Sequence, residues 1–146
     1  MSAMIETYRG AVYPWHCDHM GHMNVMWYVG KFDEATWNLF AELGITPDFL
    51  RDNARGMAAV QQELRYKREL LAGDVVAVRS GVLEMREKVV KFVHEMRHAK
   101  TGELSSVCVL TAVHMDSKAR KSTAFPADVL QRGREHLCEY DLAKGN

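Results

Sequence analysis

The residues best suited to chemistry lie together in one short run, residues 15–24, which reads WHCDHMGHMN. It holds one carboxylate, Asp18, and ends at Asn24, with a thiol, a glycine and the histidines His16, His19 and His22 around them. An amphipathic stretch follows directly, so the run lies where an extended segment passes into a helix. The first N–H groups of a helix have no intrahelical partner and point toward developing negative charge. A carboxylate just before them can therefore act on a bound carbonyl group.

Two other interpretations of this run carry less weight. The histidines, the thiol and the carboxylate are all good metal ligands, but ligands spaced by three residues share a face only on a helix. Gly21 and Pro14 indicate a turn instead, so we predict no metal here. Cys17 beside a histidine can serve as a nucleophile. Neighbours on an extended segment point to opposite sides, so with Asp18 facing the site we predict that Cys17 is a packing residue.

The element that must position Asp18 is a helix predicted over residues 25–43. Asn24 can cap its start, and Gly44 followed by Pro47 marks its end. Lys31 falls on its polar side. Its apolar side consists of residues at helical spacing, namely Tyr28, Phe32, Ala35, Leu39 and Leu43.

Five segments have the character of strands: residues 8–15, 58–68, 75–85, 89–99 and 104–115. The last four are joined by connectors too short for a parallel crossover, so we predict antiparallel neighbours. We expect the helix to lie against an apolar face formed by Val90, Phe92 and Met96, then Val107, Val109, Thr111 and Val113. Residues 125–137 are predicted to form a short final helix. The order indicates an α+β fold in a single domain, residues 1–146.

Composition limits the possible partners. The chain has 146 residues, of which 47% are hydrophobic, and 19 basic side chains balance 19 acidic ones. A net charge of zero gives no global field for nucleic acid or an anionic membrane, and leaves homo-oligomers without self-repulsion. Three widely spaced cysteines suit a reducing compartment. No apolar run approaches the ~20 residues of a membrane span, and the first residues do not form a signal peptide. We therefore expect a cytoplasmic protein.

Two motifs resemble a known family, the hotdog-fold acyl-CoA thioesterases of the 4-hydroxybenzoyl-CoA thioesterase type. The first is CDHMGHMNVMWYVGKFDEA, which begins at Cys17 and is similar to the family's pattern of an aspartate, a glycine, a His-x-Asn pair, a tyrosine and an acidic residue near the middle of the helix. The second is TAVHMD, which begins at Thr111. The resemblance implies a single hotdog fold, in which an antiparallel sheet of about five strands wraps around a central helix.

The resemblance also implies roles for particular residues. Asp18 matches the family's catalytic aspartate, which acts as nucleophile or general base on the thioester carbonyl. Val25, seven residues later, matches the position whose backbone N–H polarises that carbonyl. His22 and Asn24 match the His-x-Asn pair. His22 is a candidate for orienting Asp18 or the attacking water, and a loop histidine bonded to the backbone is the alternative. Because some relatives place a catalytic glutamate elsewhere, Glu63 is the alternative carboxylate, although an exposed charge beside Arg65 is its simpler interpretation.

The expected activity is hydrolysis of an acyl-CoA to the free acid and coenzyme A, without a cofactor. Arg120 and Lys121 are the preferred contacts for the coenzyme A phosphates, although each can equally belong to a solvated face. Family resemblance implies a homodimer or homotetramer with the acyl site between subunits. A non-catalytic acyl-CoA-binding module and an acyl-carrier-protein thioesterase are the alternatives. The acyl group stays open among aromatic, medium aliphatic and quaternary ammonium groups, given the aromatic residues Trp15, Trp27, Tyr28, Trp37 and Phe40.

Overall fold

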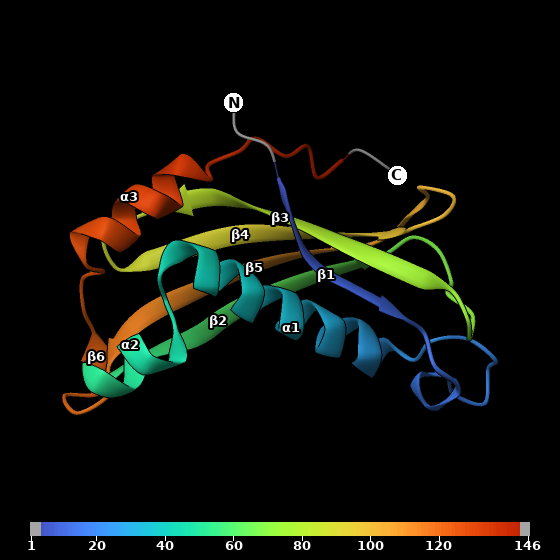
Figure 1. The fold of residues 1–146 in the computed structure, drawn as a ribbon, viewed down its shortest axis with the longest axis horizontal. Helices are drawn as coiled ribbons and strands as arrows, with labels where there is room; N and C mark the ends of the chain where they lie inside the picture. The colour runs from blue at the N-terminus through green and yellow to red at the C-terminus, as the bar shows by residue number, and fades with distance from the viewer. Residues whose placement is uncertain (1–3, 144–146) are drawn as a thin grey trace.

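The computed structural model describes residues 4–143 and shows one antiparallel sheet that curls around a long helix, α1, Val25–Leu43 (Figure 1). The strand order is β1-β3-β4-β5-β2, and a short β6 pairs with β5. The predicted α+β architecture is therefore confirmed, but one expected pair of neighbouring strands is wrong. Strand β2 pairs with β5 and not with β3, because β3 lies between β1 and β4. The strands are β1 Ile5–Ala11, β2 Arg55–Tyr66, β3 Val75–Met85, β4 Val89–His98, β5 Leu104–Asp116 and β6 Lys121–Ser122. The other α-helices are α2, Pro47–Asp52, and α3, Ala127–Glu135.

Helix α1 begins after Asn24 and ends before Gly44, the two capping residues that the sequence predicted. The side chain of Asn24 accepts a hydrogen bond from the Met26 N–H, and Gly44 closes the helix in the left-handed region, with φ of 88°. The predicted apolar side is confirmed. All five of its members are buried, namely Tyr28, Phe32, Ala35, Leu39 and Leu43. Burying a large apolar side chain contributes about 1.5–3 kcal/mol, so this stripe ties the helix firmly to the sheet.

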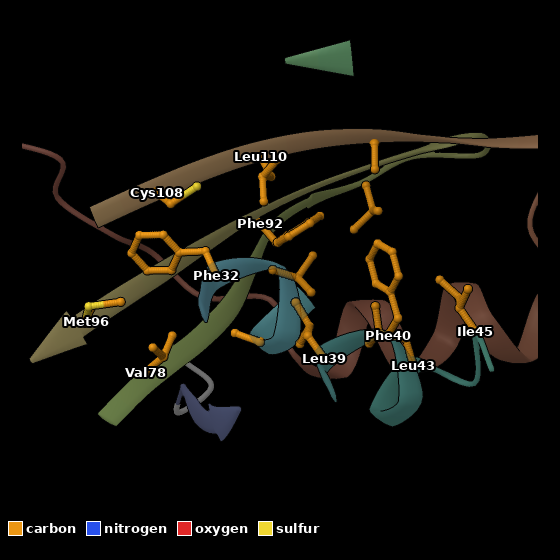
Figure 2. Packing of buried hydrophobic residues seen from close by; sticks show 14 of the residues in the cluster. Phe32, Leu39, Phe40, Leu43, Ile45, Val78, Phe92, Met96, Cys108 and Leu110 are labelled. Atoms are coloured by element: carbon orange, nitrogen blue, oxygen red, sulfur yellow. The ribbon is translucent and has the colours of Figure 1, made fainter. Parts of the chain in front are cut away.

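The side of β5 that faces the helix differs from the prediction. Cys108, Leu110 and Ala112 belong to the core that packs against α1, and Figure 2 shows Leu110 directed from β5 toward the helix. Val107 and Val109 instead pack on the outer face of the sheet with Val93. There the C-terminal segment covers them through Cys138, Tyr140 and Leu142. Because both faces of β5 are covered, its alternation did not reveal which one faces the helix.

Lys31 also departs from the prediction, because its side chain is only 2% exposed. The ammonium group donates to the Tyr8 hydroxyl at 2.8 Å and to the Ala11 carbonyl at 3.3 Å. It lies 5.0 Å from the centre of the Tyr8 ring. A buried ammonium needs such partners, and β1 provides both.

Several boundaries also differ. The strand predicted over residues 8–15 ends at Ala11, because Pro14 begins a 3-10 turn, η1, Pro14–His16. Strand β2 begins at Arg55 rather than at residue 58, and neither α2 nor β6 was predicted. The final helix, α3, lies within the predicted residues 125–137. Within residues 4–143, none of the helices has the length and apolar character needed to cross a bilayer.

The packing of α1 gives a first prediction. Leu39→Ala removes a side chain that is fully buried, so we expect the free energy of unfolding to fall by about 2–5 kcal/mol. Glu42→Ala, on the exposed side of the same helix, is the matched control and should change it by no more than about 0.5 kcal/mol. Urea denaturation at one protein concentration measures both. A loss below about 1 kcal/mol for Leu39→Ala would contradict the packed position.

Candidate active site

The loop between η1 and α1 is fixed at several points by backbone hydrogen bonds. The Gly21 N–H donates to the Asp18 carbonyl at 3.0 Å, and Gly21 has φ of 88°, which favours glycine. The Asp18 N–H donates to the carbonyl of His22 at 3.2 Å. At the end of the loop, the Met23 N–H donates to the Leu70 carbonyl at 2.7 Å. The loop therefore holds Asp18 in one place just before the helix.

The carboxylate of Asp18 is oriented by two hydrogen bonds. Its Oδ2 accepts from Asn24 Nδ2 at 2.7 Å, and its Oδ1 accepts from the Met20 N–H at 2.8 Å. These donors, the Asn24 amide first, lower the pKa of Asp18 below its ordinary value. The carboxylate is therefore ionised at neutral pH. In that form it can accept a proton or attack a carbonyl carbon.

The side chain of Asn24 makes two hydrogen bonds at once. Its Oδ1 accepts from the Met26 N–H at 3.0 Å, which caps α1, while its Nδ2 holds Asp18. The Trp27 N–H donates a hydrogen bond to the Asn24 carbonyl. That leaves the N–H of Val25 as the first-turn amide with no hydrogen bond to another described residue, as expected at the first helical position. The sequence predicted the cap but not the bond to Asp18.

His22 is placed differently from the role suggested by the sequence. Its Nε2 lies 2.8 Å from Glu69 Oε2, in the connection between β2 and β3. The two donors to the Asp18 carboxylate are Asn24 and Met20, so Asn24 has the orienting position that was considered for His22. A catalytic role for His22 stays a prediction.

The other residues of the run serve the local structure. His16 Nδ1 accepts from the Tyr13 N–H at 2.9 Å, and burial lowers the pKa of this imidazole. The Cys17 thiol is half-buried and lies 3.8 Å from the Tyr13 carbonyl. No cluster of three or more His, Cys, Asp or Glu side chains within residues 4–143 is arranged to hold a metal ion. The geometry therefore gives the metal interpretation no support.

Three predicted residues lie away from this loop. Arg120 and Lys121 are exposed where β5 turns into β6, at the end of the sheet opposite the loop before α1 (Figure 1). Within one chain these two residues therefore do not lie beside Asp18. Their contact with coenzyme A stays a prediction. Glu63 is exposed on β2, and its carboxylate lies 3.4 Å from Arg65. That matches its simpler interpretation as an exposed charge.

Two cavities flank the start of α1. The larger one, which we call the helix cavity, has a volume of about 420 Å³ and lies between α1 and strands β2, β4 and β5. It begins at Met26, one residue after Val25, and extends past Asp33 and Trp37. The smaller one, of about 240 Å³, includes His22 and Val25 in its lining. Sequence reasoning missed Asp33 as a lining residue, although the acidic position within the helix motif was a signal for it.

A family model described as "Thioesterase-like superfamily" matches residues 12–133, which include the loop, α1 and every strand from β2 onward. The chain belongs to the thioesterase-like superfamily. This membership confirms the predicted family resemblance and the expected thioester hydrolase activity. The predicted hotdog fold is confirmed as well.

Individual relatives are distant in sequence. A betainyl-CoA thioesterase from Pseudomonas aeruginosa is 24% identical over 90% of this chain and 83% of its own length. An L-carnitine dehydrogenase/betainyl-CoA thioesterase from Agrobacterium fabrum is 27% identical over 82% of this chain, which spans only 24% of that protein. A Staphylococcus aureus protein, solved in complex with CoA, superposes with a TM-score of 0.87 at 18% identity, over 99% of this chain and 95% of that one.

The bond between Asn24 and Asp18 yields a second prediction. We expect Asn24→Ala to raise the pKa of Asp18 toward the ordinary value, because it removes the largest cause of the lowered pKa. The change should also cost about 1 kcal/mol of stability through the lost cap. Carboxyl ¹³C NMR titration measures the pKa. Asn53→Ala is the control, because it removes an exposed side-chain hydrogen bond to the Phe49 carbonyl, and it should leave the pKa of Asp18 unchanged. An unchanged Asp18 pKa in Asn24→Ala would contradict the assigned cause.

Proposed function

We propose that this thioesterase-like protein hydrolyses an acyl-CoA, with Asp18 as general base or nucleophile and the Val25 N–H as donor to the thioester carbonyl. The observation that carries the proposal is the side chain of Asn24. One amide links an ionised carboxylate to the helix turn whose first amide has no hydrogen bond to another described residue. Both groups that the reaction needs are thus held by one residue.

The reaction can follow two courses from this arrangement. As a base, Asp18 takes a proton from water while the water oxygen bonds to the acyl carbon. As a nucleophile, its oxygen bonds to that carbon first, and water then cleaves the acyl-aspartate. In both courses the carbonyl oxygen gains negative charge near the Val25 N–H, and the carbon–sulfur bond breaks. The sulfur leaves as a thiolate and takes up a proton afterwards, so no strong general acid is required.

Coenzyme A is the carrier best supported. Relatives named for betainyl-CoA and the neighbour solved with CoA favour it over an acyl-carrier protein. A non-catalytic binding module is disfavoured because an oriented, ionised carboxylate in the loop just before α1 has no evident use in binding alone. Arg120 and Lys121 are proposed to contact the phosphates.

We also propose that the protein forms a homodimer through the outer edge of β2, or a tetramer built from such dimers. Strand β2 is the last in the sheet order, so no other strand within residues 4–143 covers its outer edge. Long exposed edges favour pairing with another strand. Val60 on this strand is 61% exposed, and Val25 and Met26 at the start of α1 are 57% and 62% exposed. A second copy would cover these apolar groups and complete the walls of the site.

The mechanism predicts a large effect at one carboxylate. Asp18→Asn keeps the shape of the side chain but removes its charge, so we expect kcat for the best thioester to fall about 100-fold or more. His22→Ala should lower kcat by less than Asp18→Asn does. Asp48→Asn, an exposed carboxylate at the start of α2, is the control and should keep normal turnover. Steady-state kinetics on a panel that includes betainyl-CoA provide the measurement. Near-normal turnover in Asp18→Asn would reject the mechanism and direct attention to Glu63.

The assembly gives a separate prediction. We expect light scattering at micromolar concentration to report two or four copies of the 16.6 kDa chain. Val60→Glu should shift the protein toward monomer, because it puts a charge at the proposed contact. Val75→Glu, at the start of β3, is the control for an exposed valine elsewhere on the sheet. A wild-type monomer would exclude the shared site.

A further inference from the structure

The helix cavity is lined along α1 by residues from successive turns of one face. Met26, Gly30, Asp33, Trp37 and Phe40 follow one another at spacings of four, three, four and three residues. Strands β2, β4 and β5 close the other side, with Phe92 and Leu110 among the lining residues. The cavity is therefore mainly apolar and aromatic, and its volume of about 420 Å³ suits a small acyl group.

Asp33 brings the charge to this lining. Among the described residues that border the cavity it is the one ionisable side chain, and no lysine, arginine or histidine accompanies it. Within residues 4–143 its carboxylate forms no ion pair. A ligand that fills the cavity removes water from this carboxylate. Without a positive charge to replace the water, that loss costs free energy.

The aromatic walls suit a cation as well. The rings of Trp37 and Phe40 meet edge to face with centroids 5.5 Å apart, and Phe40 meets Phe92 in the same way at 5.5 Å. These contacts hold the rings as one connected wall beside Asp33. The faces of aromatic rings attract alkylammonium groups, and tryptophan does so most strongly.

The floor of the cavity offers no competing positive charge. Thr36 lines it, and the Thr36 hydroxyl lies 3.0 Å from the Phe32 carbonyl and 2.8 Å from His94 Nε2. Burial lowers the pKa of His94 to about 3, so this imidazole is uncharged. The hydroxyl proton has the Phe32 carbonyl as its acceptor, so Thr36 offers no free donor to a ligand. Gln62 is the other uncharged polar residue of the lining.

We infer that the helix cavity binds an acyl group ending in a quaternary ammonium, with Asp33 as its counter-ion and Trp37 as the aromatic face. This inference rests on the proposed function, since it names the acyl group that the thioesterase accepts. A quaternary nitrogen has no N–H to satisfy, so it needs aromatic faces and a counter-charge rather than a set of hydrogen-bond acceptors, and Trp37 and Asp33 provide these. Asp33 and Trp37 are thus the residues that determine specificity, while Asp18 acts on the thioester.

The test compares matched pairs of thioesters. One member of each pair ends in trimethylammonium and the other in tert-butyl, which has the same shape and no charge. Val25 and Asp33 are eight residues apart, on the order of 12 Å along the helix axis, so the pairs cover spacers of one to five methylenes. The variants are Asp33→Asn, Trp37→Leu and the control Glu34→Gln, whose exposed carboxylate does not line the cavity.

We expect kcat/KM to favour the charged member of the best pair by about 10-fold or more. Asp33→Asn should remove that preference by lowering kcat/KM for the charged member alone. Trp37→Leu should reduce the preference in part, and Glu34→Gln should preserve it. Preference for the tert-butyl member in every pair, or an equal loss for both members in Asp33→Asn, would overturn the inference while leaving the proposed hydrolysis intact.

Binding separates this inference from failure of the hydrolysis itself. Thioether analogues of the same pairs cannot be hydrolysed, and calorimetry measures their Kd whether or not the protein turns over a thioester. Asp33→Asn should weaken binding of the charged analogue about 10-fold and leave the Kd of the neutral analogue unchanged, while the control Glu34→Gln should leave both Kd values unchanged. Equal affinity of the two analogues for the unmodified protein would overturn the inference.

Discussion

The rest of the structure depends on the burial of α1 against the inner face of a single sheet. Phe32, Ala35, Leu39 and Leu43 are completely buried, and together they fix the rotation and the position of the helix. Once the helix is fixed, its first turn can face only one loop and one end of the sheet. The chemistry of that turn and the cavity along the same helix therefore follow from one packing arrangement. The proposed donor, the Val25 N–H, and the proposed acyl-selecting residues Asp33 and Trp37 lie on different turns of this one helix.

The second constraint is the amide of Asn24, which connects the stability of the helix to the charge of Asp18. The pKa of Asp18 is lowered in the folded protein, first by this amide and then by the Met20 N–H. A lowered pKa means that the ionised form stabilises the fold. That contribution is complete above the unfolded-state pKa and is lost as pH falls through the folded-state value. The loop is thus held best at the pH values at which the carboxylate can act as a base.

The sequence by itself determined the elements that depend on near neighbours along the chain. Asn24 and Gly44 set the ends of α1, and the 3.6-residue spacing of apolar side chains set its buried side. The short connectors between β3 and β4 and between β4 and β5 fixed the antiparallel pairing of those strands. The pairing of β2 with β5 was not predicted. The motif around Asp18 also indicated the family and the position of the carboxylate. Capping, helical periodicity and hairpin geometry act over a few residues, so a single sequence contains them.

The tertiary structure alone decided contacts between residues far apart in the chain. Leu110 rather than Val109 faces the helix, because the C-terminal segment covers the other side of β5 and makes both sides apolar. Lys31 can be buried because the Tyr8 hydroxyl, on a different element, accepts a hydrogen bond from its ammonium group. His22 meets Glu69, and Asp33 borders a cavity whose far wall comes from the sheet. Such contacts depend on how separate elements pack, and local spacing does not contain that information.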